Sequence, residues 1–346
     1  MAPGLLIPIG VVLAFAVAVG LSGLLSWAGP VDRPRERGMH SAPTPTSGGL
    51  AIIGGVCAAV LALRLDGSGA IGHAIAWALA IAVAHGLLGA VDDVVDLGAR
   101  FKLGAQVLLA LAFAALVMHP HSFVLTGTLA IGLPDWLTIP GTALWIVVVT
   151  NAINFMDGSN GLVAGSVAVV AAGLGAVCLL PGPTLTGFVL LFTGAACLGF
   201  LPFNFPRARL FQGDAGALFV GSLLAMLAVI GAGPFVGTGL LPLWTGPIAL
   251  LAILTDVLLT LIARARRREP LLEAHRSHLF QRWLAARGGD HAALAWRFWA
   301  IMATFTGMAM GAALLGPLAA SLIFPASLAL AVGGWLWLDR GLRKAG

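Results

Sequence analysis

The sequence predicts an all-α protein that crosses a membrane many times, and three observations lead to this fold class. Hydrophobic residues make up 59% of the 346 and charged residues only 10%, against roughly 45–50% and about 25% in soluble domains. The mean hydropathy is +0.99. Several apolar runs approach or exceed the ~20 residues that a helix needs to span a bilayer. A soluble globular protein is therefore excluded.

Eleven such runs follow one another, and clusters of Pro and Gly separate many of them. We expect a single membrane domain over residues 1–346. The first run has no basic residue before it and is too long for a signal-peptide core, so it predicts a retained helix. The predicted spans lie near residues 4–28, 48–65, 71–91, 103–119, 140–156, 161–180, 185–202, 215–232, 239–263, 294–315 and 318–338.

The distribution of basic residues predicts how these spans are oriented. If alternate loops lie on alternate sides of the membrane, 18 of the 19 Lys and Arg fall on one side, and only Arg64 falls on the other. Loops on the cytoplasmic side carry the excess of Lys and Arg. The N-terminus is therefore expected outside and the C-terminus in the cytoplasm. The predicted cytoplasmic loops lie near residues 29–47, 92–102, 156–161, 203–214 and 264–293.

Acidic residues follow the same asymmetry, which the positive-inside rule does not require. All of the 14 Asp and Glu except Asp66 and Asp135 fall on or near the cytoplasmic side. Polar chemistry is therefore expected at the inner face. The pI of about 10.1 reflects basic loops that meet anionic lipid, and it gives no reason to expect nucleic acid as a partner.

The first two inner loops each hold a candidate ligand site. The stretch TPTSGG, residues 44–49, can form a tight turn whose N–H groups approach a ligand. Asp92, Asp93 and Asp96 follow in the next loop, with Lys102 six residues further on. A solvated helix end explains one Asp well and three poorly, because neighbouring carboxylates repel one another unless a cation lies near. Three carboxylates suggest a cation site or a proton acceptor.

The third loop interrupts an apolar region with TNAINFMDGSNGL. Asn151, Asn154 and Asp157 are spaced i, i+3 and i+6, so on a helix they form one stripe, and Asn160 follows a break at Gly158. Such a stripe suits hydrogen bonding to a polar ligand or a hydrated ion. Hydrogen bonds between helices are the alternative, particularly for Asn151.

The last two inner loops offer groups suited to phosphate. Asp214 lies among small residues just before a helix, where it is a candidate ligand or an N-cap. Arg264 lies eight residues after Asp256 on roughly the same helical face. His275 and His278, with Arg276 between them, provide ionisable donors suited to a diphosphate.

Together these loops provide oxygen ligands of the Mg²⁺ type, donors for phosphate and glycine-lined turns. Mg²⁺ usually binds through one or two carboxylates plus substrate phosphates, and it can neutralise a diphosphate during in-line attack by an oxyanion. The sequence has no Walker A loop and no Cys/His zinc pattern. No role is assigned to the remaining histidines, which are His73, His85, His119 and His121.

Four ordered motifs, VDDVVD, NAINFMDGSNGL, FQGDAGALFVG and EAHRSHLFQR, resemble those of the polyprenyl-phosphate N-acetylhexosamine-1-phosphate transferase family. RPRERGMHSAPTPTSGGLAI resembles that family's first cytoplasmic loop, so the likeness runs from about residue 31 to residue 283. The resemblance implies an enzyme of the bacterial inner membrane, with a cytoplasmic active site, that transfers a sugar 1-phosphate from a UDP-amino sugar to a polyprenyl phosphate. It implies Mg²⁺ as cofactor, with Mn²⁺ as an alternative, and leaves a homodimer open.

The resemblance also implies roles for individual residues. Asp92 and Asp93 match the pair associated with the lipid phosphate, and Asp214 matches the metal ligand. Asp157 matches the aspartate near the nucleotide. His275 and His278 match the family's histidine motif near the diphosphate. The remaining residues expected to bind substrate are Asn151, Asn154, Asn160, Asn204, Phe211, Lys102, Arg264 and Arg276.

The sequence departs from the family at two places, and the first bears on the substrate. The branch that transfers muropeptides has consecutive histidines in the last loop, whereas this chain has HRSH. The sequence therefore favours the branch that begins O-antigen, capsule or related cell-surface glycans, with GlcNAc, FucNAc, QuiNAc or a bacillosamine-type sugar as donor. Ala217 replaces a Ser found in many members, with no clear effect.

Other functions are also open at this point. Within the family, a teichoic-acid or muropeptide-type phosphotransferase is the alternative, and a polytopic transporter or channel is the alternative outside it. The sequence does not choose between one-step transfer and a covalent aspartyl-phosphate route.

Overall fold

The structure is a computed structural model that describes residues 3–29, 31–32, 44–65, 72–126, 129–180, 184–233, 241–271, 273 and 275–345. Within these ranges the chain is almost entirely helical, as the composition predicted. The helices are α1 (Pro3–Ala28), α2 (Gly48–Leu65), α3 (His73–Val95), α4 (Ala99–Leu116), α5 (Asp135–Met156), α6 (Leu162–Leu179), α7 (Leu185–Asn204), α8 (Gly213–Ala232), α9 (Thr245–Ala249), α10 (Leu251–Arg266), α11 (Leu279–Ala286), α12 (His291–Leu315) and α13 (Pro317–Ala345).

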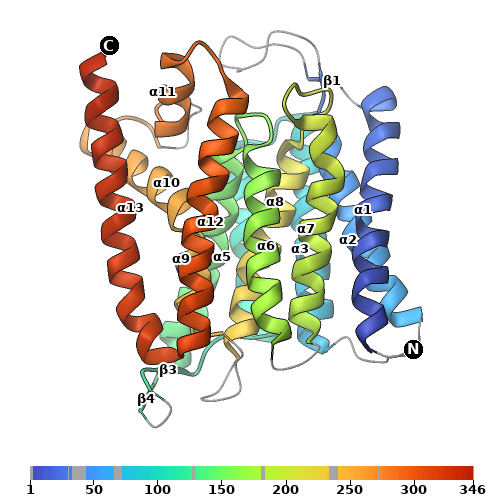
Figure 1. Ribbon diagram of the computed structural model, residues 1–346, viewed down its shortest axis with the longest axis vertical. Coiled ribbons are helices and arrows are strands. Elements are labelled where there is room, and N and C mark those ends of the chain that lie inside the picture. Colours follow the sequence, from blue (N-terminus) through green and yellow to red (C-terminus); the bar gives the residue numbers. More distant parts are fainter. Residues whose placement is uncertain are drawn as a thin grey trace.

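Two short antiparallel hairpins accompany the helices. β1 (Val31–Asp32) pairs with β2 (Thr44–Pro45), with Val31 opposite Pro45. β3 (Ser122–Val124) pairs with β4 (Ala130–Gly132), with Phe123 opposite Ile131. The second hairpin lies within the connection from α4 to α5, at the end of the molecule where the N-terminus lies (Figure 1).

Nine helices of the described chain are long and apolar enough to cross a membrane, and Gly48–Ala62 forms a shorter apolar helix. The fold class is thus confirmed, and the predicted number of spans stays a prediction. The predicted span 239–263 is wrong as a continuous helix. It is divided into α9 and α10 at Leu250, whose backbone leaves the helical region (φ −99°, ψ 3°), and residues 234–240 lie outside the described ranges.

The long helices stand side by side, and the two chain termini lie at opposite ends of the molecule (Figure 1). α8 lies at the centre, since 83% of its apolar stretch is buried, whereas only 17% of that of α13 is. α8 packs against α3, α5, α2 and α7. Residues at the first turn of α8 therefore lie where several helices converge.

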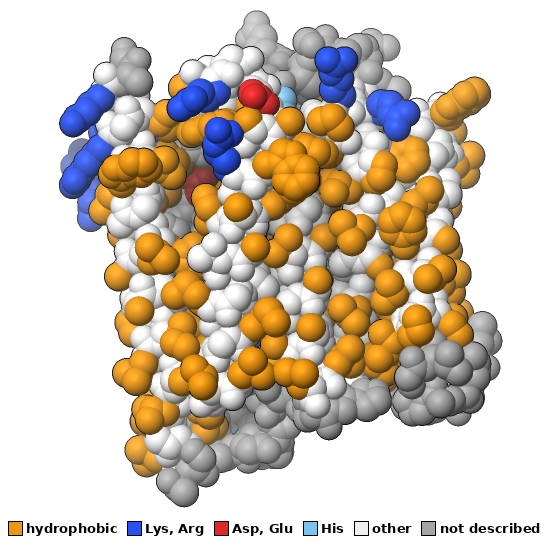
Figure 2. All heavy atoms as spheres, in the orientation of Figure 1, with side chains coloured by type: hydrophobic (Ala, Val, Ile, Leu, Met, Phe, Trp, Pro, Cys, Tyr) orange, Lys and Arg blue, Asp and Glu red, His pale blue; other side chains and the backbone are white. Residues whose placement is uncertain are grey.

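The surface has the asymmetry that the sequence predicted. In the view of Figure 2, hydrophobic side chains cover the middle of the molecule, and the visible Lys and Arg lie at the end that carries the C-terminus. We call this end the basic end. Arg33, Arg35 and Arg37 lie outside the described residues, as does the side chain of Arg64.

Close backbone contacts at the basic end fix the start of α8. A Cβ at Gly89 of α3 would lie 2.3 Å from the Asp214 carbonyl oxygen, so only glycine permits this approach. The N–H groups of Gly48 and Gly49 donate to the carbonyls of Phe211 and Gln212 at 2.9 and 2.8 Å. The expectation that the TPTSGG turn presents its N–H groups to a ligand is therefore wrong for these two glycines, which join α2 to the segment before α8.

Candidate active site

A lysine connects three helices at the basic end. Lys102, in the first turn of α4, donates through Nζ to Asp92 Oδ2 at the end of α3 and to Asp214 Oδ2 at the start of α8, at 2.6 Å each. The three side chains are partly buried, with exposed fractions of 12–26%. One ammonium between two carboxylates offsets their mutual repulsion, which is stronger here than in water. We call these three residues the charge cluster.

The oxygens of the cluster differ in how they are occupied. Asn154, on the last turn of α5, donates through Nδ2 to Asp214 Oδ1 at 2.8 Å. Both oxygens of Asp214 therefore have partners within the protein. Asp92 Oδ1 is buried and has no hydrogen-bond partner among the residues that the structure describes. A buried oxygen of this kind is costly unless a ligand satisfies it, so it marks a position for a cation or a donor.

Asp93 contacts the same helix terminus in another way. Its Oδ1 accepts the N–H of Asp214 at 3.0 Å, and its Oδ2 accepts the N–H of Ala215 at 3.2 Å. These are unpaired donors of the first turn of α8, so Asp93 acts as a cap supplied by another helix. Gly213 has φ +67°, and a Cβ there would lie 2.5 Å from Asp93 Oδ2, which makes glycine necessary beside this cap.

Asp157 immediately follows α5 and is partly buried. Burial and the negative charges of Asp214 and Asp93 raise the pKa of its carboxyl well above the usual value. Asp157 is thus influenced by the charges of Asp214 and Asp93, and Asn154 of the same stripe contacts the cluster directly. The role predicted for the stripe in binding a ligand stays a prediction.

The donor set fits a Mg²⁺ ion. The Lys102 ammonium contacts two carboxylates, those of Asp92 and Asp214. The Asp93 carboxylate accepts the Asp214 N–H, so it lies beside them. Hard oxygen ligands with excess negative charge are what Mg²⁺ requires, and the buried oxygen of Asp92 that lacks a partner is one such ligand. Asp92 would hold the ion through Oδ1, and Asp214 would join it by giving up one of its contacts with Lys102 and Asn154. The oxygens of Asp93 hold the backbone of the first turn of α8.

The two histidines of the last inner loop lie together. The ring centroids of His275 and His278 are 4.8 Å apart, and the ring of His278 lies 5.9 Å from Phe155, two residues before Asp157. Burial lowers the pKa of both imidazoles to about 4, helped by the positive charge of Arg264. Both rings are therefore neutral near pH 7, where each offers one N–H.

Arg264 is buried and organises this loop. It contacts Glu269 Oε2 at 3.1 Å and Ser277 Oγ at 3.4 Å, and it donates to the Pro270 carbonyl. Its guanidinium is thus largely engaged within the protein, whereas the sequence suggested a phosphate donor. Arg276 is exposed on the same loop.

Other predicted substrate residues connect parts of the protein. Asn151 donates to Gln106 Oε1 of α4 and to the Val147 carbonyl, so its amide joins two helices, as the alternative for this residue anticipated. Asn204 accepts the N–H of Gly161 and donates to the Leu210 carbonyl at 3.0 Å.

Two further residues were predicted to bind substrate. Asn160 donates through Nδ2 to the Pro206 carbonyl at 3.2 Å, and together with Asn204 it fixes the turn after Asp157. Phe211 is partly exposed just before α8, and its backbone N–H donates to the Pro45 carbonyl.

Asp256 has a structural role that the sequence did not reveal. This buried carboxylate of α10 accepts the N–H groups of Leu279 and Phe280 at 2.8 and 3.2 Å, and the indole N–H of Trp335 at 3.1 Å. It therefore caps α11 and ties it to α10 and α13. An isolated carboxylate in an apolar helix was the available signal, since such a group needs partners.

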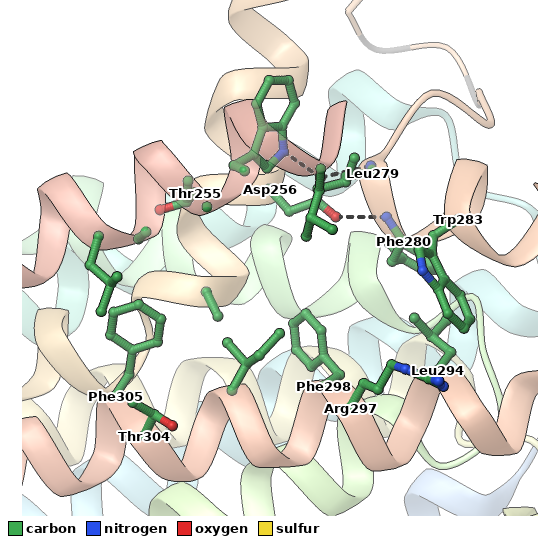
Figure 3. Close-up of a pocket in the computed structure, with 17 residues that line it drawn as sticks. Thr255, Asp256, Leu279, Phe280, Trp283, Leu294, Arg297, Phe298, Thr304 and Phe305 are labelled. Carbon is green, nitrogen blue, oxygen red and sulfur yellow. Dashed lines mark hydrogen bonds between the residues drawn. The ribbon is translucent and has the colours of Figure 1, made fainter. Parts of the chain in front are cut away.

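A mostly apolar cavity of about 390 Å³ lies next to Asp256 (Figure 3). α10, α11, α12 and α13 line it, with Phe298 and Phe305 on one wall and Trp283 near Arg297. The Arg297 guanidinium lies 5.2 Å from the Trp283 ring centroid. Because Phe280 lines the cavity and also packs 3.3 Å from the position of a Gly158 Cβ, the cavity adjoins the turn that carries Asp157.

The fold and the site define a polytopic membrane protein with a carboxylate–ammonium cluster at one end of its helices. The profile of glycosyl transferase family 4 matches residues 74–232, a range that includes the whole charge cluster.

Proteins of similar sequence are named as transferases of the same family. A probable undecaprenyl-phosphate N-acetylglucosaminyl 1-phosphate transferase of Bacillus subtilis is 33% identical over 261 residues, 74% of this chain and 70% of that protein. A decaprenyl-phosphate N-acetylglucosaminephosphotransferase of Mycolicibacterium smegmatis is 33% identical over 285 residues, 74% and 69% of the two chains. A phospho-N-acetylmuramoyl-pentapeptide-transferase of a Synechococcus strain is 35% identical over 250 residues, 66% and 70%.

The chain belongs to glycosyl transferase family 4. The family resemblance carried by the four motifs is thereby confirmed.

Proposed function

We propose that this protein transfers the sugar 1-phosphate of a UDP-linked amino sugar to a polyprenyl phosphate and releases UMP. Family membership and the names of the relatives support this class of reaction. The observation that carries the proposal is Lys102 Nζ, 2.6 Å from both Asp92 and Asp214. Three segments far apart in the chain form one phosphate-binding centre at the end of the membrane helices, where a lipid phosphate and a soluble nucleotide can meet.

In this reaction an oxygen of the lipid phosphate attacks the β-phosphorus of the UDP-sugar. A new phosphorus–oxygen bond forms, the bond from the β-phosphorus to the bridging oxygen breaks, and UMP leaves with that oxygen. No proton needs to move if the lipid phosphate enters as a dianion. If it enters as a monoanion, the Asp92 carboxylate is the acceptor beside the cluster. The protein's contribution is mainly positioning and charge stabilisation.

Each group of the site has a proposed task. The Lys102 ammonium draws a phosphate oxygen towards the cluster, and Asn154 holds Asp214 in place. His275 and His278 donate their N–H groups to the diphosphate. Mg²⁺ bound by Asp92 and Asp214 would supply neutralisation of the diphosphate charge. Asp93 keeps the first turn of α8 in position for these contacts.

The cavity next to Asp256 suits the prenyl chain of the acceptor. Its lining is mostly apolar, its volume falls within the range of small-molecule pockets, and it adjoins the turn of Asp157. A chain lying there would leave its phosphate at the basic end.

We further propose that the active site faces the cytoplasm of a bacterial inner membrane. The visible Lys and Arg gather at the end that carries the C-terminus, and cytoplasmic loops carry the excess of these residues. This places the N-terminus outside.

We assign the chain to the branch that begins O-antigen, capsule or related glycans, with UDP-GlcNAc as the first donor to test. The HRSH sequence of the last loop supports the branch, and relatives named for N-acetylglucosamine transfer support the choice of donor. A relative named for muropeptide transfer makes the UDP-linked muropeptide the comparison substrate.

The test uses purified protein with radiolabelled UDP-GlcNAc, related UDP-amino sugars or UDP-muropeptide, together with undecaprenyl phosphate and Mg²⁺. We expect lipid-linked label from an amino sugar donor, its loss in Asp214→Asn, and its retention in Asp290→Asn, an exposed carboxylate near α11. Label from the muropeptide alone would overturn the branch assignment. Solute transport by protein that transfers no sugar from any donor would overturn the enzyme in favour of a transporter.

A further inference from the structure

Three potential metal ligands meet at the end opposite the basic end. His119 follows α4, His121 immediately precedes β3, and Asp135 is the first residue of α5. His119 Nε2 and His121 Nδ1 lie 3.3 and 3.4 Å from the same atom, Asp135 Oδ1. The three ligand atoms all lie within 4.8 Å of one another. None of these residues takes part in the transferase centre.

Two of the three spacings between ligand atoms are those of a tetrahedral zinc site. Zn²⁺ binds imidazole nitrogen and carboxylate oxygen at about 2.0–2.2 Å, so two ligand atoms on one tetrahedral ion are roughly 3.3–3.5 Å apart. The two distances to Asp135 Oδ1 match this value. Two imidazoles and a carboxylate suit zinc, whereas Mg²⁺ and Ca²⁺ prefer oxygen ligands alone.

The surroundings of His119 orient its ring towards this point. Its Nδ1 lies 2.7 Å from the Ala114 carbonyl oxygen at the end of α4, so Nδ1 carries the proton and Nε2 is directed at Asp135. Metal-binding histidines usually donate their second nitrogen to a carbonyl or carboxylate in this way. The side chain of His119 is only 12% exposed, whereas that of Asp135 is 66% exposed, which leaves one side of the cluster open to water.

We propose that His119, His121 and Asp135 bind one Zn²⁺ ion, with water as the fourth ligand. The ion would join the end of α4 to the start of α5 across the β3–β4 hairpin, whose base is already closed by the Leu133 N–H bonded to the His121 carbonyl at 2.8 Å. The hairpin in turn contacts Trp244, the residue before α9, since the ring centroids of Phe123 and Trp244 are 5.6 Å apart. Trp244 stacks on Phe324 of α13 at 4.2 Å. Zinc would therefore stabilise this end of the molecule.

The experiment uses full-length protein without a polyhistidine tag, treated with a chelator and desalted into detergent. Zn²⁺ is titrated by calorimetry, and Co²⁺ is used as a spectroscopic probe of tetrahedral coordination. We expect one Zn²⁺ per chain, a tetrahedral Co²⁺ spectrum, and a higher unfolding temperature with zinc. His119→Ala and Asp135→Asn should lose all three signals.

The matched control is His73→Ala, which removes another histidine from the same end. Its Nε2 accepts the indole N–H of Trp77 at 2.9 Å, outside the cluster, so this variant should bind zinc like the native chain. If native protein binds no more zinc than His119→Ala, or if His119→Ala and Asp135→Asn bind it unchanged, the proposal is overturned and the contacts are only hydrogen bonds or ion pairs. The binding readout does not depend on sugar transfer, so failure here leaves the transferase proposal standing.

Discussion

Two adjacent carboxylates at the end of α3 have different surroundings. Asp92 contacts Lys102 and has a buried oxygen without a partner, whereas both oxygens of Asp93 accept backbone N–H groups of α8. The family resemblance associated both residues with the lipid phosphate. The structure favours Asp92 as the residue that meets a ligand and Asp93 as the residue that holds Asp214 in place. Only contacts between distant segments distinguish the two.

A prediction at the residue scale concerns the protonation of His278. Burial and Arg264 lower the pKa of this imidazole to about 4 from an ordinary 6.5. Between these values the unfolded chain binds a proton that the folded chain does not, so folding stability falls as the pH falls from 6.5 towards 4. The loss amounts to about 3.4 kcal/mol at most, at 1.36 kcal/mol per pKa unit.

The measurement is the stability difference between pH 7.5 and pH 4.5, compared between native protein and His278→Asn. We expect native protein to lose more folding stability at pH 4.5 than His278→Asn does, because Asn does not titrate. His73→Asn, which changes an exposed ring, should behave like native protein. The prediction is contradicted if native protein and His278→Asn lose the same folding stability between pH 7.5 and pH 4.5.

At the scale of elements, the apolar runs predicted the bounds of the long helices to within five residues, because bilayer thickness fixes their length. The exception is the end of α13, which continues to Ala345 although the predicted span ended near residue 338. The break between α9 and α10 and the helix α11 inside the loop 264–293 were missed. α11 has only eight residues, which is too short to be stable alone. It depends on Asp256, which lies 23 residues before Leu279, and no local pattern reveals such a distant cap.

A first prediction at this scale concerns that cap. Asp256→Ala leaves the buried N–H groups of Leu279 and Phe280 without an acceptor, which costs roughly 2 kcal/mol. Amide hydrogen exchange in α11 should then accelerate by about 30-fold if local opening limits it. Asp290→Ala, which removes the exposed N-cap of α12, should leave α11 exchange unchanged. Unchanged α11 exchange in Asp256→Ala would show that this carboxylate does not stabilise the helix.

A second prediction concerns the cavity of Figure 3. Gly334 lines it and has open space where a Cβ would lie, so Gly334→Phe fills the cavity without a clash at Cβ. We expect a KM for undecaprenyl phosphate that is raised about tenfold or more, equivalent to roughly 1.4 kcal/mol, and an unchanged KM for the UDP-sugar. Gly333→Phe is the matched control, because Gly333 also has open space and does not line the cavity. If Gly334→Phe and Gly333→Phe have the same KM for undecaprenyl phosphate, the prenyl chain does not bind in this cavity.

At the scale of the whole molecule, charge distribution and motif order predicted the class of fold, the asymmetry of the surface and the family. Composition carries this information because hydrocarbon excludes charge wherever helices contact lipid. For Asn151 the sequence left two roles open, and it did not reveal the contacts of Asn204, since an amide that binds a ligand and one that joins two helices look alike in a sequence. Only the packing of the folded chain distinguishes these two roles.

Sidedness is the prediction at this scale. In a chain without its three native cysteines, Ile131→Cys places one exposed thiol at the end with the β3–β4 hairpin, and Arg287→Cys places one at the basic end. A membrane-impermeant maleimide added to intact cells should label only the first, and permeabilised cells should label both. If intact cells label only Arg287→Cys, the protein has the opposite orientation and the charge cluster lies outside.

The most direct measurement for the central claim is a double-mutant cycle on the charge cluster, using initial rates of lipid-linked sugar formation. Lys102→Met and Asp214→Asn should each lower the rate by about 100-fold or more, as the loss of a charge-stabilising group at a reacting phosphate does. Because the two residues act as one unit, the double variant should be no slower than the slower single variant. Full activity in Lys102→Met, or losses that multiply in the double variant, would contradict a centre built on Asp92, Lys102 and Asp214.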